Sequence, residues 1–200
     1  KIGYMFGDFG NDFTFLLSSM FMLKFYTDVM GIAPGVVGTL MMAARFIDAF
    51  TDVTMGQIVD RSKPTKDGKF KPWIKRVCGP VAIASFLIYQ SGFANMSYGF
   101  KVVWMTVTYI LWGSIFYTAI NIPYGSMVSA VSDSPKDRAE LSTWRSIGAT
   151  LAGLVIGAGT PIVAYVAVNG NTVLSGPRMT VIAGGFSVAA ILCYLLCFWL

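Results

Sequence analysis

The sequence has 200 residues, of which 55% are hydrophobic and only 12% are charged, and its formal net charge is +5 at pH 7. A soluble domain usually carries about 25% charged residues, so this composition excludes an ordinary soluble fold. Apolar runs recur along the whole chain, and about 20 such residues cross a hydrocarbon core about 30 Å thick. The sequence therefore predicts an all-α integral membrane protein with no separate soluble domain.

Six apolar runs follow one another along the chain. The connectors between them are rich in Gly, Pro, Asn and Ser, which favour loops over further helices. A transmembrane barrel would instead show short alternating segments. We therefore expect one six-helix transmembrane domain over residues 1–200. The predicted spans are residues 5–26, 35–59, 77–96, 102–131, 142–166 and 179–199, and the predicted loops are residues 27–35, 60–73, 97–101, 132–140 and 168–178.

Lysine and arginine are distributed unevenly between the predicted loops. Seven of them lie between residues 61 and 76, whereas the opposite side of the membrane has only Lys101, Arg178 and, near a span end, Lys24. Because basic loops stay in the cytoplasm, we expect both ends of the chain to face the cytoplasm, with the protein in the cell membrane. Nucleic-acid binding is not expected, since it needs aromatic stacking partners and a soluble fold.

The three cysteines, Cys78, Cys193 and Cys197, lie within or beside apolar runs and show neither a disulfide framework nor a C-x-x-C metal spacing. We predict that they are small apolar core residues. The chain has no histidine, the usual proton shuttle and the commonest metal ligand. Any proton chemistry must therefore use carboxylates, and no cofactor is expected.

Three charged residues interrupt the second predicted span, in the stretch A-R-F-I-D-A-F-T-D-V-T-M-G at residues 44–56. Arg45, Asp48 and Asp52 are spaced i, i+3 and i+7, so they share one helix face. Asp48 lies about 20 Å along the span. Charges facing lipid would cost several kcal/mol, so this face must contact other helices or water. An Arg45–Asp48 ion pair would be purely structural, but it leaves a second carboxylate that needs a cation, either Na⁺ or a proton.

Two further spans carry polar residues. In the first, Asp8 lies near the membrane surface, where water could solvate it, whereas Asn11 and Asp12 lie deeper. In the fifth, Trp144 and Arg145 lie about one turn inside. Arg145 could extend to the surface, or it could bind a carboxylate or sugar hydroxyls. Polar groups from several helices near the midplane are typical of a solute cavity.

Five stretches together resemble one family. They are G-Y-M-F-G-D-F-G-N-D-F, F-Y-T-D-V-M-G, A-R-F-I-D-A-F-T-D-V-T-M-G, D-G-K-F-K-P-W and N-I-P-Y-G. They are similar to the glycoside-pentoside-hexuronide:cation symporters, the melibiose permease and glucuronide transporter relatives within the major facilitator superfamily. The resemblance implies secondary active symport of a sugar or glycoside, of the glucuronide, xyloside or galactoside class, with H⁺ or Na⁺ by alternating access. It implies no enzyme activity.

The resemblance also implies roles for individual residues. Asp48 and Asp52 match the coupling-cation positions, where Na⁺ could bind. Asn121 stands where the sodium-coupled melibiose permease has an aspartate, and this difference leaves H⁺ and Na⁺ both open. G-Q-I-V-D-R-S at residues 56–62 resembles the superfamily's loop signature, which implies a gating role. The implied set is Asp48, Asp52 and Asn121 for the cation, Asp12, Arg145, Asn11, Tyr117 and Trp144 for the substrate, and Arg45, Gly56, Asp60 and Arg61 for gating or structure.

Such transporters have twelve helices in two six-helix halves, so we expect this chain to be the N-terminal half. It lacks an initiator Met and ends at Leu200 within an apolar run, which supports the same expectation. Its expected partners are the lipid bilayer, the sugar and the missing C-terminal half.

Two alternatives remain open. A membrane-embedded, metal-dependent CDP-alcohol transferase also spaces acidic residues by four, as Asp48, Asp52, Gly56 and Asp60 would allow, but its pattern needs D-G followed by A-R ahead of the later acids. A non-catalytic helix-bundle subunit would leave the charges within the spans without a role.

Overall fold

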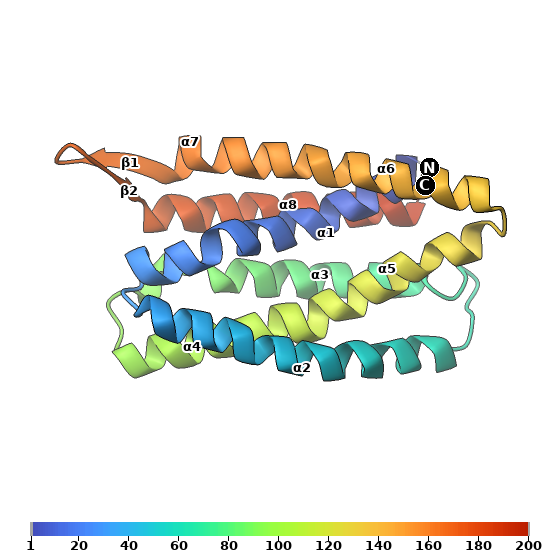
Figure 1. The fold of residues 1–200 in the computed structure, drawn as a ribbon, viewed down its shortest axis with the longest axis horizontal. Helices are drawn as coiled ribbons and strands as arrows, with labels where there is room; N and C mark the ends of the chain where they lie inside the picture. The colour runs from blue at the N-terminus through green and yellow to red at the C-terminus, as the bar shows by residue number, and fades with distance from the viewer. Residues whose placement is uncertain (1, 200) are drawn as a thin grey trace.

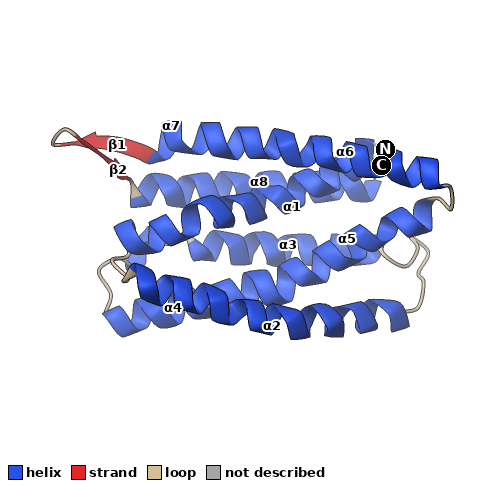
Figure 2. Ribbon diagram, in the orientation of Figure 1, coloured by secondary structure: helices blue, strands red, loops and turns tan. Residues whose placement is uncertain are grey.

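The computed structural model describes residues 2–199, which form six continuous helical rods along the long axis of the molecule (Figure 1). The start of α1 and the end of α8 lie at the same end (Figure 1). Figure 2 shows that helices make up almost all of the regular structure, so the predicted all-α class is confirmed. The rods are α1 (Ile2–Lys24) with the π-helical segment η1 (Phe25–Val29), α2 (Pro34–Arg61), α3 (Lys71–Ile88), α4 (Tyr98–Ile110) with η3 (Leu111–Tyr117) and α5 (Thr118–Val131), α6 (Pro135–Leu154) with η4 (Val155–Gly159) and α7 (Thr160–Ala164), and α8 (Gly176–Trp199).

Within residues 2–199, three rods are long and apolar enough to cross a membrane: Tyr98–Val131, Pro135–Ala164 and Gly176–Trp199. The others are shorter or more charged; α2, for example, carries Asp48 and Asp52 in its apolar stretch. Large apolar side chains such as Phe50, Ile162 and Val181 are exposed on the outer faces, as expected where lipid is the solvent. The structure therefore agrees with a membrane protein, while six spans remain a prediction.

α1 packs against both α6 and α8, and α3 packs against α8 and α5. Small residues allow α1 to approach its neighbours closely, as is common between membrane helices. A Cβ atom added at Gly7 would lie 2.3 Å from Cε2 of Tyr124, and one added at Gly148 of α6 would lie 2.8 Å from the carbonyl oxygen of Met5. Both positions therefore require glycine for this packing.

Several helix ends differ from the ends of the predicted spans. The third predicted span, residues 77–96, corresponds to a helix that begins at Lys71 and ends at Ile88, after which Ser91–Phe93 forms a 3₁₀ turn. α6 begins at Pro135, seven residues before the predicted start at residue 142. In both cases a proline in the first turn starts the helix. The charged residues that follow it have the composition of a loop, but a helix that extends beyond the membrane surface can contain them.

The predicted loop at residues 168–178 is also partly wrong, because it contains most of a β-hairpin. Strand β1 (Tyr165–Val168) pairs antiparallel with β2 (Asn171–Leu174). Asn169 and Gly170 form the turn with φ of 52° and 80°, which matches the two positive φ angles of a type I′ turn. The hairpin connects α7 to α8 at one end of the bundle (Figure 1).

Candidate functional site

An open cavity of about 530 Å³ lies between α1, α2, α4, η3 and α5. This volume is typical of a small-molecule site. Its lining combines aromatic side chains with polar and charged ones. Five predicted site residues, Arg45, Asp48, Asp52, Tyr117 and Asn121, line it together with Phe15, Ser18, Tyr109, Trp112 and Thr118.

The two acidic residues of α2 are each hydrogen-bonded to a hydroxyl of the neighbouring rod. The hydroxyl of Ser114 donates to Oδ1 of Asp48, and the hydroxyl of Thr118 donates to Oδ1 of Asp52 over 2.9 Å. Each pair advances by four residues, from 48 to 52 and from 114 to 118, so the contacts form two rungs of a ladder between two helices. We call these four residues the carboxylate ladder.

The π-helical segment η3 positions the hydroxyl side of this ladder. A π-helical turn inserts an extra residue into an α-helix and is frequent at functional sites. Ser114 lies inside η3, and Thr118 directly follows it. The hydroxyl of Thr118 also donates to the carbonyl of Gly113, five residues back. These hydroxyls were missed by sequence reasoning, because nothing in the stretch W-G-S-I-F-Y-T marks a π-helical turn.

The charge balance within the cavity is negative. Nη1 of Arg45 lies 3.6 Å from Oδ2 of Asp48, and the Arg45 side chain is 63% exposed. An exposed ion pair of this length contributes little to stability. Asp52 has no cationic side chain within ion-pair distance among residues 2–199. One carboxylate therefore remains without a basic partner, and the cavity has the charge to attract a cation.

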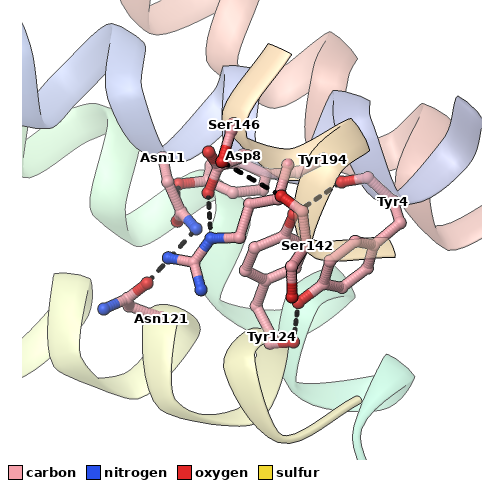
Figure 3. Close-up of polar contacts among 9 residues, drawn as sticks. Tyr4, Asp8, Asn11, Asn121, Tyr124, Ser142, Ser146 and Tyr194 are labelled. Carbon is pink, nitrogen blue, oxygen red and sulfur yellow. Dashed lines mark hydrogen bonds and ion pairs between the residues drawn. The ribbon is translucent and has the colours of Figure 1, made fainter. Parts of the chain in front are cut away.

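A second polar cluster joins α1 to α6 and α5 (Figure 3). Nε of Arg145 donates to Oδ1 of Asp8 over 2.8 Å, and the Asp8 side chain is only 5% exposed. The Arg145 guanidinium lies 5.5 Å from the ring centroid of Tyr124. The reading of Asp8 as a solvated surface residue is therefore wrong, because Arg145 pairs with it inside the bundle. Arg145 binds a carboxylate, one of the two roles open to it inside the bundle.

Tyr4 and Tyr124 hold this cluster in place. Their rings stack with centroids 4.5 Å apart. The hydroxyl of each donates to the main-chain carbonyl of the other (Figure 3). These reciprocal bonds fix the start of α1 against α5.

Two asparagines connect the cavity to α8. Nδ2 of Asn11 donates to Oδ1 of Asn121 over 3.4 Å, and the hydroxyl of Tyr194 donates to Oδ1 of Asn11 over 2.8 Å. Because Asn121 lines the cavity, this chain of amides leads from the cavity to α8. Asn11 itself is buried and does not line the cavity.

The other predicted residues lie outside the cavity. Asp12 and Trp144 are partly buried next to the Asp8–Arg145 pair in sequence, and the structure does not bring them into the cavity lining. Asp60 and Arg61 are exposed at the end of α2, where Nζ of Lys69 donates to the Asp60 carbonyl over 2.9 Å. Gly56 lies one turn earlier in the same helix. No group of metal-ligating residues occurs within residues 2–199.

An acidic, solute-sized cavity enclosed by apolar helices fits a carrier for a small polar molecule. A family described as MFS/sugar transport protein matches residues 3–200. The chain belongs to this family. The predicted resemblance is therefore confirmed at the level of the family.

Three similar proteins show what share of their length this chain matches. The chain is 39% identical over 150 residues to the glucuronide carrier protein homolog of Escherichia coli K12, covering 75% of the chain and 32% of that protein. It is 38% identical over 166 residues to the isoprimeverose transporter of Lactiplantibacillus pentosus, covering 82% and 34%. It is 35% identical over 167 residues to the putative glycoside/cation symporter YagG of Escherichia coli K12, covering 83% and 35%. The chain spans about a third of the length of these relatives.

These relatives carry the names of carriers, transporters and symporters. The prediction that the chain is not an enzyme is therefore confirmed, and the CDP-alcohol transferase is not supported.

Proposed function

We propose that the full-length protein is a cation-coupled symporter of a sugar or glycoside, in which this chain forms the N-terminal six-helix half. The names of the relatives support a glycoside-type substrate. The observation that carries the proposal is the carboxylate ladder, since it places one uncompensated acidic residue on the wall of a solute-sized cavity. Both ends of the segment face the cytoplasm in this proposal.

The coupling cation, Na⁺ or H⁺, binds at Asp48 and Asp52, with Asn121 nearby on the same cavity wall. Binding neutralises the excess negative charge of the cavity. The hydroxyls of Ser114 and Thr118 hold the two α2 carboxylates toward η3 and α5, and after rotation the hydroxyl oxygens are available to a bound Na⁺.

The sugar occupies the cavity and contacts Tyr117 and Asn121, with Asn11, Asp12, Trp144 and Arg145 contributing from the adjoining cluster. Arg145 is held by Asp8 in this structure, so it contacts the sugar only after a local rearrangement. In this proposal the bound cation raises the affinity for the sugar. By thermodynamic linkage, the sugar then raises the affinity for the cation by the same factor.

Transport follows from alternating access, in which the two halves rock around the site. Arg45 restrains Asp48 in the cavity, whereas Gly56, Asp60 and Arg61 lie toward the exposed end of α2. In this proposal Gly56, Asp60 and Arg61 contact the second half and act in gating.

The proposal is tested with the full-length protein in proteoliposomes. Uptake of labelled glycosides is measured with an imposed Na⁺ gradient, with an imposed H⁺ gradient, and with neither. We expect concentrative uptake with one of the two gradients, and equilibration only in the absence of both. Uptake of every accepted glycoside that is unaffected by either gradient would overturn the symport proposal.

A further inference from the structure

A second, apolar groove of about 300 Å³ lies between α3 and α8. Its walls include Ala82, Ile83 and Phe86 of α3 and Gly184, Val188 and Ile191 of α8. None of these residues belongs to the elements that line the polar cavity, which are α1, α2, α4, η3 and α5. We call this surface the α3–α8 groove.

Beyond the residues that line the groove, the α3 face that carries Ile83 continues toward the start of that helix. Lys75, Gly79 and Ile83 are spaced by four residues, so they lie on one helix face. A Cβ atom added at Gly79 would meet no atom within 4 Å, so the path between Lys75 and Ile83 is open. On α8, Ile191 and Phe198 are seven residues apart and share the facing surface.

Basic residues lie where this path reaches the end of the helices. Lys75 and Arg76 are exposed, and Nζ of Lys75 lies 5.1 Å from the ring centroid of Phe198. Neither residue forms an ion pair with a carboxylate among residues 2–199. Trp199, at the end of α8, is 77% exposed, and tryptophan is enriched at the membrane–water interface. The mouth of the groove is therefore positively charged and amphipathic.

We propose that the α3–α8 groove binds an anionic phospholipid, with its phosphate at Lys75 and Arg76 and one acyl chain running past Gly79 to Ile83. The eight steps from Lys75 to Ile83 span about 12 Å of helix, close to the half-thickness of about 15 Å of a hydrocarbon core. Two unpaired positive charges favour an anionic lipid over a zwitterionic one, because the latter brings its own cation. This site goes beyond the transport function and depends only on the chain lying in a membrane.

The test uses the purified full-length protein in detergent, titrated with phosphatidylglycerol or phosphatidylcholine, with bound lipid counted by native mass spectrometry. We expect wild type to bind phosphatidylglycerol more tightly than phosphatidylcholine. The double variant Lys75→Gln/Arg76→Gln should lose at least about fivefold in phosphatidylglycerol affinity and little in phosphatidylcholine affinity. The matched control Lys63→Gln/Lys66→Gln, which removes the same charge from an exposed loop, should change neither.

A third variant tests the acyl-chain path. Gly79→Leu places a side chain in open space, so the fold should be retained, while binding of both lipids should fall. Equal losses in the double variant and its control, or equal wild-type affinity for the two lipids, would overturn the proposal. Unchanged binding by Gly79→Leu would do so as well. Displacement of phosphatidylglycerol by an equal concentration of inorganic phosphate would identify a free-phosphate site instead, and so would also contradict a lipid site.

Discussion

Replacing Gly148 with alanine should destabilise the packing of α1 against α6. The added Cβ would lie 2.8 Å from the carbonyl oxygen of Met5 and 3.6 Å from Cβ of Asp8. The first contact is with main-chain rather than side-chain atoms, so the helices must move apart. Overpacking of this kind costs about 1–3 kcal/mol, whereas alanine gains up to about 1 kcal/mol over glycine in a helix interior. The net expectation is a loss of about 1–2 kcal/mol.

Gly153 on the same helix provides a matched control. A Cβ there would lie 3.8 Å from Cδ1 of Leu16, an ordinary contact, so Gly153→Ala should keep the gain in helix propensity and be neutral or slightly stabilising. Thermal unfolding of the full-length protein, followed by the reaction of a thiol-sensitive dye with the buried cysteines, compares the two variants. We expect a Tm about 2–6 °C below wild type for Gly148→Ala and no decrease for Gly153→Ala. Equal Tm values for the two variants would refute the proposed close approach of α1 and α6.

Three further predictions concern topology and the site. A cysteine replacing Lys66 should react with an impermeant thiol reagent only from the cytoplasmic side, and one replacing Asn171 only from outside; reversed labelling would invert the proposed orientation. Arg145→Lys in the full-length carrier should weaken sugar binding measured by calorimetry, because an ammonium group cannot reproduce the planar guanidinium contact; unchanged affinity with normal expression would remove Arg145 from the substrate site. Ser114→Ala and Thr118→Ala should each change the apparent cation affinity of uptake about tenfold, as expected for a lost hydrogen bond to a charged group. A Na⁺ site loses a hydroxyl oxygen and binds more weakly, whereas a proton site binds more tightly because the ionised carboxylate loses its donor; no change in either variant would limit the carboxylate ladder to a structural role.

Patterns within a single helix could be predicted from the sequence. The spacing of Arg45, Asp48 and Asp52 placed them on one face, and the structure brings all three to the cavity wall. This works because the helical period depends only on local geometry. The positions of helix ends were less predictable, since the charged first turns of α3 and α6 have the composition of loops.

Contacts between distant parts of the chain could not be predicted in this way. The Arg145–Asp8 pair joins residues 137 positions apart, and helix spacing says nothing about which rods are neighbours. The hairpin, in contrast, had a readable signal: an Asn-Gly pair between V-A-V and N-T-V is a strong hairpin pattern. The turn residues alone indicate only a loop at residues 168–178, so the hairpin was not predicted.

The most direct test of the coupling site measures sugar affinity of the purified full-length carrier against Na⁺ concentration and pH. Wild type should bind sugar more tightly as the coupling cation increases, by about 5- to 150-fold. In Asp48→Asn and Asp52→Asn this dependence should disappear while the protein stays folded and downhill sugar exchange persists. Asp67→Asn, in the exposed loop after α2, should behave as wild type. Poor expression of both variants, with expression and cation dependence restored by also neutralising Arg45, would show that the carboxylates only anchor that arginine, and would contradict the account.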